Sequence, residues 1–135
     1  MKKFWAGGFL YHPKNNCVLI HKRDLNTKFN PNSWAFFGGL NKDNETPIDC
    51  FIRELYEEIK IKVKEEEVIT LYDYFNEEFQ THRFVFYVIT SKKDKSGFVL
   101  SEGADFDWIK LNSLDKYNLT EKTEKDLRFF NKIKK

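Results

Sequence analysis

Three glutamates stand close together in the sequence and could share a divalent metal ion. On an α-helix, Glu54, Glu57 and Glu58 occupy positions i, i+3 and i+4, so their carboxylates lie within one turn. Like charges at this spacing repel each other, and the repulsion must be relieved by Arg53 or by a bound cation. Carboxylate oxygens favour a hard ion such as Mg²⁺ or Mn²⁺, whose coordination substrate phosphates can complete. An ordinary solvent-exposed acidic face is the alternative.

The residues around the glutamates predict a helix that positions them. Thr46 is a typical N-cap, and Pro47 suits the first helical position. Apolar residues then recur at steps of three and four, which gives the helix one stripe facing a core and places Arg53 and the glutamates on the other side. The stripe consists of Ile48, Phe51, Ile52, Leu55 and Ile59.

The first part of the chain predicts strands. Apolar runs at residues 4–11 and 17–23 are separated by a Pro/Asn cluster, which indicates a hairpin. A short strand at residues 34–37 should stop at the pair Gly38-Gly39, where the backbone can turn sharply.

The second part of the chain adds more strands and a last helix. Strands are expected at residues 68–75, 83–90 and 105–111, after a Lys/Glu-rich connection. Residues 120–133 predict an amphipathic helix, whose inner side carries Leu127, Phe130 and Ile133. This order of elements indicates an α/β or α+β architecture, with helices on both faces of a sheet.

Composition limits the class of protein. The 135 residues suit one domain over residues 1–135, and 41% apolar with 33% charged residues is typical of a globular fold. A net charge of +2 provides no broad basic field for a nucleic-acid polymer. The apolar runs fall far short of the ~20 residues of a membrane helix. Cys17 and Cys50 form no CxxC pair, which favours buried thiols in a reducing cytoplasm over a disulfide or zinc site.

From Gly39 onward the chain reads GLNKDNETPIDCFIRELYEEIKI, and this run resembles the Nudix hydrolase signature. The family pattern is a glycine, five residues, Glu, seven residues, and then Arg-Glu-apolar-any-Glu-Glu-any-Gly-apolar. Every fixed position matches except one, because Lys60 stands where the family has its last glycine. The preceding WAFFGG resembles the family's aromatic-x-x-Pro-Gly-Gly, with Phe37 in place of Pro. The segment from Glu102 to Trp108 resembles the acidic-to-Trp segment of triphosphatase members.

This resemblance implies a fold and a chemistry. The fold would be an α/β/α sandwich around a mixed β-sheet. The cofactor would be Mg²⁺, with Mn²⁺ as a substitute. Nudix enzymes hydrolyse a nucleoside diphosphate linked to another moiety, by attack of water at phosphorus. The metal neutralises the pyrophosphate and lowers the pKa of bound water, while a carboxylate accepts the proton.

The resemblance also assigns the metal ligands. The Gly39 carbonyl, Glu57 and Glu58 would be ligands. Glu54 would be a ligand or the general base. Glu102 matches a loop glutamate that adds a metal contact or serves as the base in some members, so the identity of the base stays open.

Further positions are assigned to orientation and substrate binding. Glu45 and Arg53 would orient the carboxylates. Arg23 resembles a position that contacts substrate in triphosphatase members, and His82 and Arg83 could face a phosphate. Each of the three could equally be a surface cation. The aromatic candidates for stacking on a base, which could also be core residues, are Trp5, Phe9 and Phe79.

The expected substrate is a small nucleotide, namely a (d)NTP or an oxidised (d)NTP that is cleaved to nucleoside monophosphate and pyrophosphate. Nudix enzymes for ADP-ribose tend to carry a Pro downstream of the signature, and those for dinucleoside polyphosphates a Tyr. Phe75 and Asn76 occupy this region here. ADP-ribose or dinucleoside polyphosphate hydrolysis is still an alternative, as are a catalytically weak nucleotide-sensing module and a structural ion site. A monomer or homodimer in the cytoplasm is expected.

Overall fold

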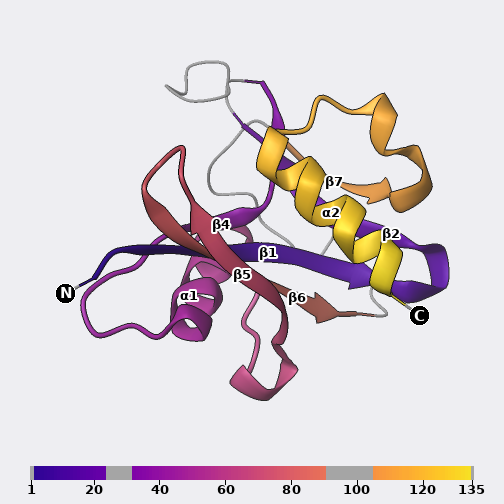
Figure 1. The fold of residues 1–135 in the computed structure, drawn as a ribbon. Coiled ribbons are helices and arrows are strands. Elements are labelled where there is room, and N and C mark those ends of the chain that lie inside the picture. The colour runs from indigo at the N-terminus through magenta and orange to yellow at the C-terminus, as the bar shows by residue number, and fades with distance from the viewer. Residues whose placement is uncertain (1, 24–31, 91–104, 135) are drawn as a thin grey trace.

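One mixed sheet organises the molecule (Figure 1). The computed structural model describes residues 2–23, 32–90 and 105–134. Within them, seven strands follow the order β3-β2-β1-β6-β5, with β4 paired to β1 and β7 paired to β2. Strands β1 and β6 run parallel, and the other pairs are antiparallel. The strands are β1 (Phe4–His12), β2 (Cys17–Lys22), β3 (Trp34–Ala35), β4 (Phe37–Leu40), β5 (Ile69–Asn76), β6 (Thr81–Ile89) and β7 (Asp105–Lys110).

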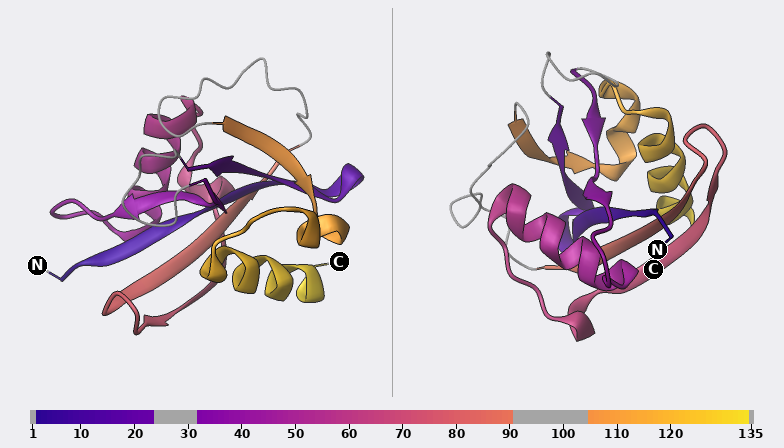
Figure 2. Two further views of the ribbon diagram at one scale, coloured as in Figure 1. Left: turned by 90° about the horizontal axis from the view of Figure 1, so that it is seen from above. Right: turned by 90° about the vertical axis from the view of Figure 1, so that its left-hand side faces the viewer.

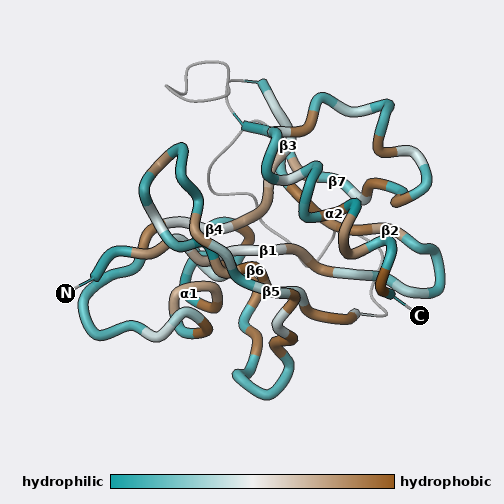
Figure 3. The backbone as a smooth tube through the Cα atoms, viewed as in Figure 1, coloured by the Kyte–Doolittle hydropathy of each residue, from teal (hydrophilic) through white to brown (hydrophobic). Residues whose placement is uncertain are grey.

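Two helices cover opposite faces of this sheet, α1 (Pro47–Ile59) and α2 (Glu121–Ile133) (Figure 2). Side chains alternate along a strand, so Ala6 and Leu10 of β1 pack in the cluster under α1, whereas Phe9 packs in the cluster under α2. The loop leading into α1 and the β5–β6 turn are hydrophilic (Figure 3). The expected α/β/α sandwich around a mixed sheet is therefore confirmed.

Helix α1 begins where the sequence predicts. The Thr46 side chain accepts a hydrogen bond from the Asp49 N–H at 3.1 Å, and the Asp49 carboxylate accepts one from the Thr46 N–H at 3.4 Å. This reciprocal pair is a capping box, and Pro47 follows the cap. The helix ends at Lys60, whose φ of 59° is left-handed. The family glycine is thus replaced at a position that demands a left-handed turn.

Two predictions about the elements are wrong. Gly38 and Gly39 do not end a strand but lie inside β4, after a break at Phe36. Strands β1 and β4 approach so closely that a Cβ on Gly38 would lie 2.6 Å from the Ala6 carbonyl oxygen. Ile133, expected on the inner side of α2, is 50% exposed because it is the last residue of the helix.

The two cysteines and the lengths of the helices agree with what the sequence predicts. Cys17 and Cys50 are both buried, as expected. Among the described residues, neither helix has the length and apolar character needed to cross a membrane.

Candidate active site

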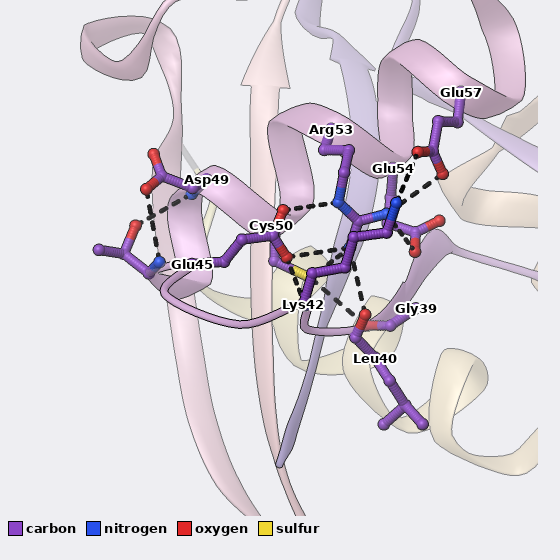
Figure 4. Close-up of polar contacts among 10 residues, drawn as sticks. Gly39, Leu40, Lys42, Glu45, Asp49, Cys50, Arg53, Glu54 and Glu57 are labelled. Carbon is purple, nitrogen blue, oxygen red and sulfur yellow. Dashed lines mark hydrogen bonds and ion pairs between the residues drawn. The ribbon is translucent and has the colours of Figure 1, made fainter. Parts of the chain in front are cut away.

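Arg53 is the centre of a charged cluster on α1 (Figure 4). Its Nε and Nη2 donate to the two carboxylate oxygens of Glu45 at 2.6 and 3.0 Å. Its Nη1 donates to Glu54 at 3.2 Å and to Glu57 at 3.1 Å. Nη2 also donates to the carbonyl of Leu40, at the end of β4. One guanidinium therefore fixes three carboxylates relative to the strand that carries the signature glycine.

The cluster shifts the titration of its members. The hydrogen bonds from Arg53 lower the pKa of Glu45 below its usual 4.5. The same pairing raises the pKa of Arg53. Burial raises the pKa of the Cys50 thiol to about 12. Cys50 therefore stays protonated at neutral pH, and it lies with its Sγ 3.6 Å from the Gly39 carbonyl oxygen.

Glu58 differs from the other glutamates, since it is only 2% exposed. One carboxylate oxygen accepts from the Gly38 N–H at 2.9 Å, and the other lies 3.7 Å from Nε2 of His21. The His21 ring stacks on Phe37, and its Nε2 lies 3.1 Å from the Phe36 carbonyl oxygen. The expectation that all three glutamates face away from the core is therefore wrong for Glu58. A buried carboxylate needs such partners to offset its lost hydration.

The donors around Gly39 fit a hard divalent cation. All of them are oxygens, from the Gly39 carbonyl and the glutamates of α1. The cluster also holds more carboxylates than cations, since Arg53 and Lys42 face three glutamates and Lys42 Nζ lies 3.8 Å from Glu57. A Cβ on Gly39 would collide with the Glu54 carboxylate, so a larger residue here would displace Glu54.

The glutamates are nevertheless not gathered around a single point. Within residues 2–23, 32–90 and 105–134, no three acidic, His or Cys side chains could hold an ion as they stand. Arg53 draws Glu54 and Glu57 to one side, while Gly38 holds Glu58 on the other. Glu102, the other expected ligand or base, lies outside the described residues.

A cavity of about 690 Å³ opens beside the cluster. It reaches Glu58 and Gly38 beside α1, where the Trp5 ring packs against Gly38, and Phe79 also lines it. Phe79 is 48% exposed. The start of α2 forms another part of the wall. The acidic helix and an aromatic surface thus share one cavity.

The candidate substrate residues fall in different places. Arg23 lines the cavity together with Phe79. His82 is not among its lining residues, and its Nε2 lies 2.7 Å from Oδ1 of Asp73 on the neighbouring strand β5. Phe9 is fully buried in the core, so the suggestion that it stacks on a base is wrong.

Sequence reasoning missed a second charged cluster, of which Arg83 lines the cavity. Asp126 of α2 is 0% exposed and accepts from Nε of Arg83 at 3.0 Å and from the hydroxyls of Tyr72 and Tyr74. The Arg83 guanidinium lies 4.0 Å from the ring centroid of Trp5. The available signal was an aspartate four residues before Phe130, on the apolar side of the helix.

Comparisons with known proteins agree with this geometry. Residues 1–132 match the family model described as the NUDIX domain. An 8-oxo-dGTP diphosphatase of Proteus vulgaris is 36% identical over 96 residues, which span 70% of this chain and 82% of that protein.

Solved structures share the fold. The MutT structure described for Aliivibrio salmonicida and Vibrio cholerae superposes with a TM-score of 0.70 at 21% identity, covering 93% of this chain and 92% of that one. Dihydroneopterin triphosphate pyrophosphohydrolase of E. coli gives 0.73 at 15% identity, covering 94% and 93%. This chain therefore belongs to the Nudix family, as a MutT-like hydrolase that cleaves phosphoric anhydride bonds.

Proposed function

We propose that this enzyme uses Mg²⁺ to hydrolyse a (d)NTP or an oxidised (d)NTP to nucleoside monophosphate and pyrophosphate. The observation that carries the proposal is a single cavity that Glu58, Gly38 and Arg23 line together with the aromatic residues Trp5 and Phe79. Such a cavity can hold phosphates near the signature helix and a base against an aromatic ring. The name of the P. vulgaris relative, an 8-oxo-dGTP diphosphatase, supports the same substrate class.

The signature residues would have different roles in the reaction. The metal would be held by Glu57, Glu58 and the Gly39 carbonyl. When bound, a divalent ion neutralises the phosphates and lowers the pKa of bound water. Glu54, whose side chain is 13% exposed, would be a further ligand or would accept the proton of the attacking water; Glu102 is the other candidate for both roles.

Two residues would support those ligands without touching substrate. Arg53 donates to Glu54 and Glu57, and Glu45 holds Arg53 in place with two hydrogen bonds. A carboxylate that is held in this way loses less conformational entropy when it binds a metal or substrate. We therefore assign orientation to Arg53 and Glu45.

The substrate would use the remaining cavity residues. Arg23 is placed to pair with a phosphate, and the exposed ring of Phe79 is placed to stack on a base. Stacking of this kind contributes about 1–3 kcal/mol per base and tolerates several bases. His82 already pairs with Asp73 and is less suited to a phosphate. With a net charge of +2, the chain is not expected to hold a nucleic-acid polymer.

The test is turnover of a nucleotide panel with Mg²⁺, with products separated by chromatography. The panel holds the common dNTPs, 8-oxo-dGTP, ADP-ribose and a dinucleoside tetraphosphate. We expect monophosphate and pyrophosphate from the triphosphates, and no turnover in EDTA. Glu57→Gln purified in parallel controls for contaminating phosphatases.

Two results would contradict the proposal. Faster turnover of ADP-ribose or of the dinucleoside tetraphosphate than of every triphosphate would show that the substrate class is wrong. Nucleotide binding without hydrolysis would indicate a nucleotide-sensing module instead.

A further inference from the structure

Asn76, at the end of β5, faces the same cavity. We propose that it selects the base, so that the enzyme prefers nucleotides whose base carries a ring carbonyl over those with an amino group at that position. This inference rests on the proposed function, because it assigns the base to one end of the proposed substrate cavity.

Strand register places Asn76 on the cavity side of the sheet. Asn76 pairs with Thr81 of β6, and Arg83, two residues further on, pairs with Trp5 of β1. Paired residues, and residues two apart on one strand, point to the same face. All four of these residues line the cavity. The sheet therefore supplies a continuous floor that ends at Asn76.

Asn76 lies far from Gly38, which contacts Glu58. Gly38 is on β4, and β4, β1, β6 and β5 are successive neighbours in the sheet. Three spacings of about 4.8 Å separate the first of these strands from the last, which is about 14 Å. When phosphates lie beside Glu58, a base that extends toward β5 would therefore reach Asn76.

The main chain fixes the orientation of the Asn76 amide. Its Oδ1 accepts a hydrogen bond from the Glu78 N–H at 3.2 Å, and only the oxygen of the amide can accept. The other end of the side-chain amide is Nδ2, which carries two hydrogens and can only donate. The residue is 6% exposed, and within the described part of the chain no protein group accepts from Nδ2. Nδ2 itself is not sealed from solvent, so an acceptor that enters the cavity can reach it.

An NH₂ group that only donates distinguishes bases by chemistry. The C6 carbonyl of guanine and the C4 carbonyl of thymine accept hydrogen bonds, whereas the amino groups of adenine and cytosine donate them. If an amino group faced Nδ2, two hydrogen-bond donors would lie against each other with no acceptor between them. Binding of a base with such an amino group is therefore disfavoured. 8-Oxoguanine keeps the C6 carbonyl, so Asn76 would accept guanine and 8-oxoguanine alike.

The experiment compares matched nucleotides. ITP and ATP carry a carbonyl and an amino group at C6, and UTP and CTP differ in the same way at C4. In each pair, kcat/KM should favour the carbonyl base by about tenfold or more. Asn76→Asp keeps an acceptor for the Glu78 N–H but replaces the NH₂ by a second acceptor, so the preference should vanish or reverse. Asn112→Asp adds the same charge at an exposed asparagine outside the cavity lining, and its preference should equal that of wild type.

Binding gives a readout that needs neither metal nor turnover. Tryptophan fluorescence should report tighter binding of IMP than of AMP to wild type, since Trp5 lines the cavity. Asn76→Asp should lose that difference. If Asn76→Asp does not fold, Asn76→Ser is the second variant. The serine hydroxyl can still accept from the Glu78 N–H, whereas the NH₂ group of the asparagine is lost.

The outcomes separate the two proposals. Equal kcat/KM within each pair in wild type, or a preference that persists in the Asn76 variants, would overturn the role of Asn76 and leave the proposed function standing. If no triphosphate is hydrolysed although IMP binds more tightly than AMP, the proposed function fails while base selection by Asn76 is retained.

Discussion

Two arginines in this enzyme hold carboxylates, but with opposite balances of charge. On α1, Arg53 donates to three carboxylates that all keep some exposure to solvent. On the other face of the sheet, Arg83 and two tyrosine hydroxyls share the single carboxylate of Asp126, which is completely buried. The first cluster has more carboxylates than cations, and the second has more donors than carboxylates.

The cluster around Arg53 can therefore bind a further cation, whereas the carboxylate of Asp126 already has all its partners from the protein. Negative charge left over beside Arg53 favours a divalent ion. Asp126 is already paired and hydrogen-bonded from three sides, and it ties α2 to β5 and β6. Substitutions in the first cluster should therefore affect catalysis, and those in the second should affect stability.

The largest effect is expected from Glu57→Gln. The side chain is 45% exposed, so the change should leave the free energy of unfolding almost unaltered. Loss of a metal-binding charge should lower kcat at saturating Mg²⁺ by about 100-fold or more. Steady-state kinetics and urea denaturation on the same preparation check both parts. A rate near that of wild type would remove Glu57 from the proposed site.

Asp126→Asn should show the reverse pattern. Loss of the carboxylate leaves the Arg83 guanidinium buried and uncompensated, which should cost about 3–5 kcal/mol of unfolding free energy. Urea denaturation measures this loss. Tyr74→Phe removes one hydrogen bond to the same carboxylate and should cost only about 1–2 kcal/mol. An Asp126→Asn protein as stable as wild type would mean that the second cluster is not structural.

Glu45→Gln should have a smaller, pH-dependent effect. Arg53 lowers the pKa of Glu45 in the folded state, so the pair stabilises the fold above the ordinary pKa of 4.5 and loses this contribution as the pH falls through the lowered pKa. At pH 7 the variant should be less stable by about 1.5–3 kcal/mol. Urea denaturation across acid pH should show the gap closing as the pH falls below 4.5. A gap of constant size would exclude ionisation of Glu45 as its source.

Lys60→Gly is expected to change least. Glycine would relieve about 1 kcal/mol of left-handed strain at φ 59°. It would also remove the Lys60 ammonium from above the Tyr56 ring, 5.3 Å from its centroid, which is worth about 0.5 kcal/mol. Urea denaturation should thus show a neutral or slightly stabilised protein, with kcat unchanged. A clear loss of stability would show that Lys60 makes a contact that outweighs the strain.

Local patterns in the sequence were sufficient to predict much of the fold. The cap at Thr46 and Pro47, the extent of α1 and the left-handed turn at Lys60 depend on residues within a few positions of each other. Alternating apolar residues likewise located most strands. The resemblance to the family then connected the helix to its chemistry.

Contacts between distant segments could not be read from the sequence. Glu58 is buried because the Gly38 N–H of β4 reaches it across 20 positions of sequence. The bond between Arg83 and Asp126 spans 43 positions. Asn76 becomes part of a cavity only once β1, β5 and β6 are side by side. Each of these roles depends on tertiary packing, which helical or strand periodicity does not encode.

The central claim, that the unbalanced carboxylates of α1 bind a divalent cation, is tested most directly by titrating Mn²⁺ and following the electron paramagnetic resonance signal of the free ion. Wild type should bind Mn²⁺ and release it to Mg²⁺. Glu57→Gln should bind at least about tenfold more weakly, whereas Tyr74→Phe should bind like wild type. Equal Mn²⁺ affinity in wild type and Glu57→Gln, or no binding by wild type, would contradict the claim.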